Sequence, residues 1–81
     1  MKDSEIREVV YRLLHRIAPE ADIQECDGEV NFRQAFDIDS YDFLRFIIAI
    51  NEELKVEIPE GEYSRVSTLN GLIGHLSARI H

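Results

Sequence analysis

The chain has few of the residues that build cross-linked or metal-bound domains. Its 81 residues include one cysteine, Cys26, three histidines and no tryptophan. A single cysteine cannot form a disulfide within the chain, and no paired Cys/His spacing matches a zinc site. We therefore expect a fold that hydrophobic packing holds together, with no metal site.

Basic residues are also scarce, and they are unevenly distributed. Nine Lys and Arg stand against sixteen Asp and Glu, a net charge of −7. Residues 1–18 carry +1 (four basic, three acidic), residues 19–62 carry −10 (three basic, thirteen acidic) and residues 63–81 carry +2 (two basic, none acidic). Such an acidic middle repels phosphates and attracts basic protein surfaces, so we expect protein partners and no nucleic acid.

Long apolar runs are absent too. No stretch approaches the roughly 18 unbroken apolar residues that a membrane helix needs, and the first residues do not resemble a signal peptide. We therefore expect a cytoplasmic protein without membrane insertion. The hydrophobic content of 44% is ordinary for a folded chain, and the length suits one small domain. Residues 1–81 are predicted to form that domain and to act as a monomer.

Apolar residues recur at helical spacing in three segments, which predicts three long helices. The first starts at Asp3 or Ser4 and stops at Pro19, and the second runs from about Tyr41 to Glu53. The third follows a predicted cap at Ser67. The apolar residues of the second helix that we expect to face inward are Leu44, Ile47, Ile50 and Leu54.

The second helix has further apolar residues, Phe43, Phe46 and Ile48, outside that stripe. A helix that is apolar nearly all round is central to its bundle or presents apolar surface to a partner, and we expect both. For Ile48, packing and docking are equally supported. The predicted fold is all-α, a small bundle of three long helices plus one short helix, with a long loop between the first two long helices.

That long loop, residues 19–39, lacks helical periodicity. We expect a short helical turn at Asn31 to Ala35 within it, and another turn at Glu60 to Ser64 in the connector before the last helix. The apolar side chains expected to hold the loop on the core are Ile23, Val30, Phe32, Phe36 and Ile38.

Asp39-Ser40-Tyr41-Asp42 opens the second helix and places a hydroxyl at its start, with an acid on both sides. Ser40 is a candidate N-cap, because its oxygen would accept from an amide of the first turn. The histidines lie near the ends of the chain, so the hydroxyl has no nearby base to activate it. We therefore expect no catalytic residue here and no enzyme.

The forty residues around this serine, DIDSYDFLRFIIAINEELKVEIPEGEYSRVSTLNGLIGHL, resemble the second half of an acyl carrier protein. That family has a D-S-L-[DE] serine, a helix that ends in acids, an E-I-P loop and a T-T-[VL] start to its last helix. The corresponding segments here are residues 39–42, 52–53, 57–59 and 67–69. The resemblance covers about half of the chain closely, and the rest by size and pattern.

The resemblance implies that a phosphopantetheinyl transferase (holo-acyl-carrier-protein synthase) attaches 4′-phosphopantetheine to Ser40. The arm would then carry acyl groups as thioesters to ketosynthase, acyltransferase or acyl-carrier-protein ligase type enzymes in fatty-acid, lipid or polyketide-type biosynthesis. The partner-binding residues that it implies are Asp39, Tyr41, Asp42, Arg45, Ile48, Glu52 and Glu53.

Two features depart from the family pattern. Arg45 stands where the family commonly has glutamate, and Phe36-Asp37-Ile38 replaces the usual Leu-Gly-hydrophobic sequence. A positive charge at residue 45 would weaken docking to a basic patch and favour another partner. We therefore expect a dedicated carrier in a specialised pathway rather than the general fatty-acid carrier.

Two other functions remain open. An aminoacyl or peptidyl carrier uses the same serine chemistry with a different cargo, and an unmodified acidic helical adaptor would use Ser40 only as a cap.

A calcium loop starting at Asp37 lacks the residues that an EF-hand needs at its sixth and twelfth positions. Cys26, flanked by Glu25 and Asp27, has no cationic neighbour to stabilise a thiolate, so we expect it to be unreactive.

Overall fold

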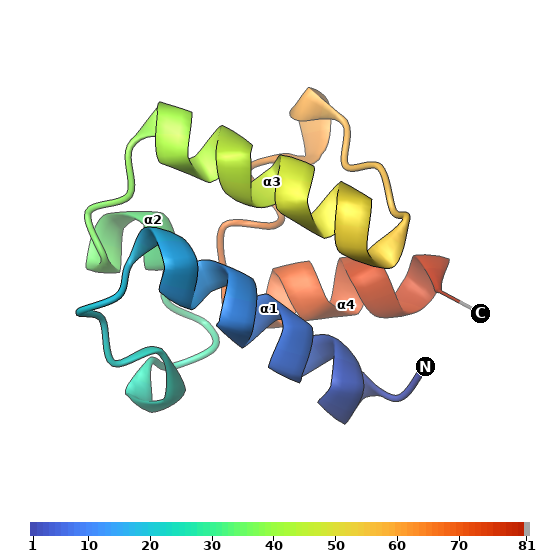
Figure 1. Ribbon diagram of the computed structural model, residues 1–81, viewed down its shortest axis with the longest axis horizontal. Helices are drawn as coiled ribbons and strands as arrows, with labels where there is room; N and C mark the ends of the chain where they lie inside the picture. The colour runs from blue at the N-terminus through green and yellow to red at the C-terminus, as the bar shows by residue number, and fades with distance from the viewer. Residues whose placement is uncertain (81) are drawn as a thin grey trace.

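Three long helices and one short one make up the bundle in the part of the chain that the structure describes, as the sequence predicts (Figure 1). The computed structural model describes residues 1–80. The helices are α1 (Asp3–Ile17), α2 (Phe32–Ala35), α3 (Ser40–Leu54) and α4 (Leu69–Arg79), and two 3₁₀ turns are η1 (Ile23–Glu25) and η2 (Glu60–Glu62). α1 packs against both α3 and α4. None of the helices in the described part of the chain is long and apolar enough to span a membrane.

The cap of α3 is Asp39 and not Ser40, so the prediction for Ser40 is wrong by one residue. The Asp39 carboxylate accepts from the Asp42 N–H at 2.8 Å, and the Asp39 backbone is extended (ψ 174°). Ser40 is already helical. A cap needs the non-helical backbone as well as the side-chain oxygen, and only Asp39 has both.

The cap of α4 is likewise Thr68 and not the predicted Ser67. The Thr68 hydroxyl accepts from the Gly71 N–H at 3.0 Å. Ser67 is buried, and its hydroxyl donates to the Tyr63 carbonyl at 2.8 Å. The Ser67 hydroxyl therefore bonds a carbonyl of the preceding turn and does not cap the helix.

The inward face of α3 differs from the predicted stripe. Leu44 is 45% exposed and Leu54 is half-buried, whereas Phe43 and Phe46 are buried. The two rings pack against Phe32 of α2, at centroid distances of 6.3 and 6.0 Å. Burying these large aromatic surfaces rotates the helix relative to the predicted stripe. The buried residues of α3 are Phe43, Phe46, Ile47 and Ile50.

The long loop is held on the core by most of the predicted side chains. Ile23, Phe32 and Ile38 are buried and Phe36 packs against the core at its edge, but Val30 is 43% exposed, so that prediction is wrong. The helical turn expected at residues 31–35 is α2, and the turn expected at residues 60–64 begins with η2.

The loop is also tied by backbone hydrogen bonds to the start of α4. The Phe32 N–H donates to the Ser67 carbonyl at 2.9 Å, and the Asn70 N–H donates to the Gly28 carbonyl at 3.0 Å. These bonds join segments about forty residues apart in sequence. They hold the first residue of α2 and the loop before it beside the start of α4.

Candidate functional site

Ser40 is the first residue of α3 and its side chain is exposed. Because Asp39 caps the helix, the Ser40 hydroxyl is not needed for the first turn. None of the hydrogen bonds found among residues 1–80 uses it. The hydroxyl is therefore accessible at the positive end of a helix of 15 residues, where an attached anion is favoured.

The other serines are in different settings. Ser67 is buried and bonded to the Tyr63 carbonyl, and Ser77 donates to Asp3 Oδ1 at 2.8 Å. Ser4 and Ser64 are exposed, but Ser4 is the second residue of α1 and Ser64 lies in the turn before α4. Ser40 differs from all four because it opens a long helix directly after a carboxylate cap.

Tyr41, Asp42 and Arg45 surround Ser40 on the first turns of α3. Tyr41 is 70% exposed. The Arg45 guanidinium lies 3.9 Å (Nη1) from Asp42 Oδ1 and 5.8 Å (Cζ) from the centre of the Tyr41 ring. With Asp39 next to Ser40, the structure brings four predicted partner-binding residues together with the serine.

A stripe of exposed residues continues along α3 from Ser40. Residues at steps of four from Ser40 share one face of the helix. They are Leu44 (45% exposed), Ile48 (49% exposed) and the exposed Glu52. The exposure of Ile48 favours docking over packing. Sequence reasoning missed Leu44 because it assigned this residue to the core, although its i+4 spacing from the serine was a usable signal.

A groove of about 300 Å³ runs beside this stripe, between α3 and the connector that contains η2. Its apolar walls come from both elements, and its rim carries two carboxylates. Tyr63 of the connector packs edge-on against Phe43, with ring centres 5.4 Å apart, and so holds the connector against α3. The residues that line the groove are Leu44, Ile47, Ile48, Asn51, Glu52, Glu57, Ile58 and Tyr63.

A larger hollow of about 460 Å³ lies between α1 and η1. None of the predicted site residues lines it, and Tyr11 and His15 are among its walls. Of these two hollows, only the groove beside α3 is lined by predicted partner-binding residues, Ile48 and Glu52.

A model of the phosphopantetheine attachment site family matches residues 4–76, most of the chain. The chain belongs to this family. Its members carry 4′-phosphopantetheine covalently on a serine, which confirms the predicted prosthetic group. These carrier domains are not catalytic themselves, and they interact with phosphopantetheinyl transferases and biosynthetic enzymes.

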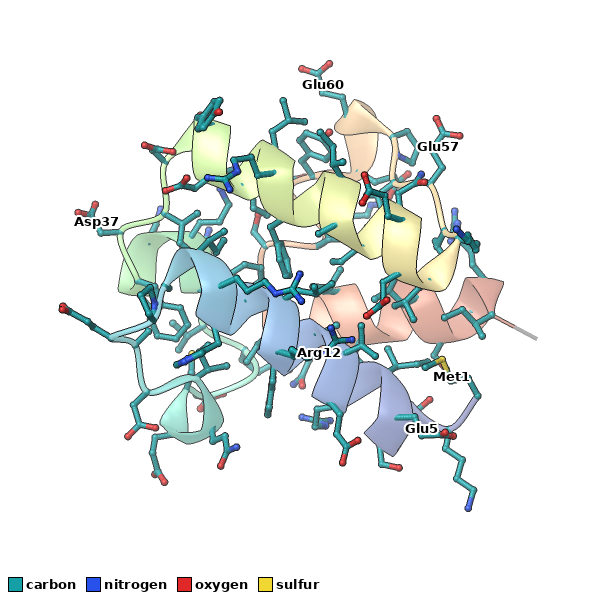
Figure 2. The ribbon with its side chains drawn as sticks, in the orientation of Figure 1. Met1, Glu5, Arg12, Asp37, Glu57 and Glu60 are labelled. Atoms are coloured by element: carbon teal, nitrogen blue, oxygen red, sulfur yellow. The ribbon has the colours of Figure 1, made fainter. Side chains whose placement is uncertain are left out.

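One predicted partner-binding carboxylate of this carrier is engaged within the fold. Glu53 of α3 forms an ion pair with Arg12 of α1, which is labelled in Figure 2. The hydrogen bond from Arg12, and then its charge, lowers the pKa of Glu53. Glu52, Glu57 and Glu60 form no ion pair with any described residue. Figure 2 shows Glu57 and Glu60 pointing away from the bundle.

The cysteine and the histidines of the carrier lie outside this region. Burial, and then the charge of Asp27, raises the pKa of the half-buried Cys26 thiol, which agrees with an unreactive residue. Glu25, which we expected to contribute, is not among the causes. His75 lies on α4 with a buried Nε2 that has no partner within the described chain, and His81 lies outside the described residues.

Proposed function

We propose that Ser40 carries the 4′-phosphopantetheine arm and that the protein is an acyl carrier. The observation that carries this proposal is the position of Ser40 as the exposed first residue of α3, with Asp39 serving as the cap. That arrangement leaves the hydroxyl available to a transferase. The phosphate of the arm would then lie near the helix N-terminus, whose partial positive charge offsets some of the repulsion from Asp39 and Asp42.

The chain supplies the attachment point and the docking surface, and its partners supply the catalysis. The thiol of the arm, when present, holds the cargo as a thioester. A serine hydroxyl needs a base to become a nucleophile. No imidazole of the described chain is hydrogen-bonded to Ser40. We therefore assign that base to the transferase.

Acyl cargo is favoured over aminoacyl cargo by the surface around Ser40. Residues 19–62, which include α3, carry a net charge of −10 (three basic against thirteen acidic residues). This charge suits the basic docking surfaces of acyl-transferring enzymes. The apolar walls of the groove beside Leu44 and Ile58 suit an apolar chain better than an amino acid. Arg45, which departs from the family pattern, supports service in a specialised pathway.

Intact mass spectrometry of wild type and Ser40→Ala tests the attachment. After incubation with coenzyme A, Mg²⁺ and a broad-specificity transferase, wild type should gain the mass of one arm and the variant none. Because Ser40 caps nothing, the variant should unfold at nearly the wild-type temperature, so a loss of loading will not reflect a loss of fold. An Ala variant that still gains one arm would overturn the assignment to Ser40.

A second experiment tests the class of cargo. The loaded chain is offered to a fatty-acyl ligase for carrier proteins and, separately, to an amino-acid-activating enzyme of the carrier type. We expect a thioester adduct from the ligase alone, with loaded chain treated with thioesterase as the blank. An adduct from the amino-acid enzyme alone would instead favour the aminoacyl carrier. A chain that takes up no arm in the first experiment would favour the unmodified adaptor.

A further inference from the structure

Four aromatic rings pack together in the core next to the first turns of α3. Phe43 is the centre of this cluster, because its ring centroid lies 6.3 Å from that of Phe32, 6.3 Å from that of Phe46 and 5.4 Å from that of Tyr63. The three phenylalanines are buried, and Tyr63 is half-buried. Centroid distances of about 4.5–7 Å are those of aromatic rings in packing contact. The rings therefore fill the space between them.

Phe43 lies beside the attachment point of the arm. It follows Ser40 by three residues, and residues three apart are neighbours on a helix. The Arg33 guanidinium of α2 lies over the Phe43 ring, with Cζ 4.2 Å from its centre. A cation in that position is attracted by the face of the ring. Phe43 is thus covered by Arg33 from α2 and by Tyr63 from the connector.

The groove beside α3 does not extend into this cluster. Tyr63 is one of its walls, whereas Phe32, Phe43 and Phe46 are not among the residues that line it. Its volume of about 300 Å³ is at the lower end of the range for small-molecule sites, about 300–1,000 Å³. An apolar chain on the arm can therefore lie against the groove, but the aromatic rings separate that chain from the core.

We propose that Phe43 and Tyr63 keep the cargo of the arm outside the bundle, in an extension that rests on the proposed function. Entry of a chain into the core would require it to displace rings that already fill their space. A chain longer than the groove therefore keeps its far end in water, at a cost that grows with each methylene. The carrier suits a short acyl group, and Phe43 and Tyr63 are the residues that determine this specificity.

The experiment installs arms of increasing length on wild type. A broad-specificity transferase attaches the arm from acetyl-, hexanoyl- or decanoyl-coenzyme A, and the midpoint temperature of thermal unfolding is measured for each product. Each methylene buried in the folded state would raise the midpoint by about 3–6 °C in a domain of this size. From the hexanoyl to the decanoyl product, wild type should gain less than about 3 °C in total. A larger gain would show that the chain is buried and would overturn the inference.

Tyr63→Ala should open the core, and Tyr11→Ala is its matched control. Tyr11 is also a half-buried tyrosine packed against the core, but it lies on α1 and lines the other hollow. From the hexanoyl to the decanoyl product, Tyr63→Ala should gain about 6 °C or more, because the chain fills the space that the ring leaves. Tyr11→Ala should gain no more than wild type. Equal gains in the two variants, or no gain in either, would overturn the role of Tyr63.

Amide NMR spectra of wild type locate the chain without any substitution. Between the acetyl and decanoyl products, changes in chemical shift should be confined to amides of the groove, such as those of Ile48 and Ile58. Changes at the core amides of Phe46 and Leu72 would overturn the inference while leaving the carrier function standing. A wild-type chain that accepts no arm from any of the three substrates would instead refute the proposed function, and the inference would fail with it.

Discussion

Asp37 has a left-handed backbone conformation, with φ at 53°, three residues before Ser40. The family usually has glycine at this place, and the structure shows why, since glycine adopts positive φ without a steric penalty. Aspartate tolerates the conformation better than most residues, but it is still strained. The departure that the sequence showed at residues 36–38 is therefore a local cost to stability beside the serine.

Asp37→Gly should accordingly raise the free energy of unfolding, by up to about 1 kcal/mol, because it relieves this strain. Asp37→Ala should be less stable than the Gly variant, since alanine has a Cβ and lacks the tolerance of aspartate. Urea unfolding of the three proteins checks the order. A Gly variant below wild type would show that the Asp37 side chain stabilises the turn by more than the strain costs.

His75 makes the stability of the protein sensitive to pH. Burial, and then the charges of Arg79 and Arg65, lowers the pKa of the imidazole in the folded state, and Glu62 opposes this shift. The folded state therefore disfavours the imidazolium. In the unfolded chain the same group takes up a proton near pH 6.5.

Because the pKa of His75 is lower in the folded state than in the unfolded chain, stability falls as pH falls. The stability that the neutral imidazole contributes is complete above the unfolded pKa, near 6.5, and is lost as pH falls towards the lower folded value. The midpoint temperature of thermal unfolding should therefore fall between about pH 7 and pH 5, and it should fall further for wild type than for His75→Gln. His15→Gln, which removes an exposed imidazole from α1, is measured beside it for comparison. Equal slopes for wild type and His75→Gln would contradict the account.

At the scale of elements, two glycines of α4 provide a matched pair. A Cβ on Gly71 would lie 2.1 Å from the Arg65 backbone carbonyl oxygen, whereas a Cβ on Gly74 would meet nothing within 4 Å. The close approach at Gly71 therefore comes from the segment before α4 and not from a neighbouring helix.

The same substitution should accordingly have opposite effects at the two sites. Gly74→Ala should stabilise the protein by about 0.5–1 kcal/mol, since alanine is the better helix former. Gly71→Ala should destabilise it by about 1–3 kcal/mol, as overpacking against a backbone atom does. Chemical denaturation of both variants checks this, and two changes of the same sign would contradict it.

The elements were predictable where the signal was local. Helical spacing and the proline after α1 placed the three helices within a residue or two. The caps of α3 and α4 were each misplaced by one residue, because neighbouring polar residues offer the same side-chain oxygen. Which of them has an extended backbone depends on the fold around each helix start. At α4 this includes the backbone bonds that hold residues 28 and 32 beside it, and such bonds are not visible in a local pattern.

The rotation of α3 was missed for a similar reason. Its apolar residues nearly surround the helix, so periodicity alone does not choose the buried face. Packing of Phe43 and Phe46 on Phe32, which is distant in sequence, makes that choice. Exposure of Leu44 follows from it.

At the scale of the whole molecule, the docking surface is a product of tertiary contacts as much as of composition. The acidic middle of the sequence, with Arg45 as an exception near the serine, predicted a surface that attracts basic protein partners. Folding pairs Glu53 with Arg12 and sets Arg45 near Asp42, whereas Glu52, Glu57 and Glu60 form no ion pair with any described residue. Figure 2 shows Glu57 and Glu60 pointing away from the bundle. The serine motif was predictable from sequence, but the pairing of Glu53 was not, because α1 supplies its partner, Arg12.

The central claim is that the arm is attached at Ser40, and locating it by tandem mass spectrometry tests this most directly. Wild type is loaded with coenzyme A and a broad-specificity transferase, digested, and the modified peptide is fragmented. The account predicts one phosphopantetheine on Ser40 and none on Ser4 or Ser64, the two other exposed serines, which serve as internal controls. An arm found on Ser64 or on any other residue, or a chain that never accepts one, would contradict it.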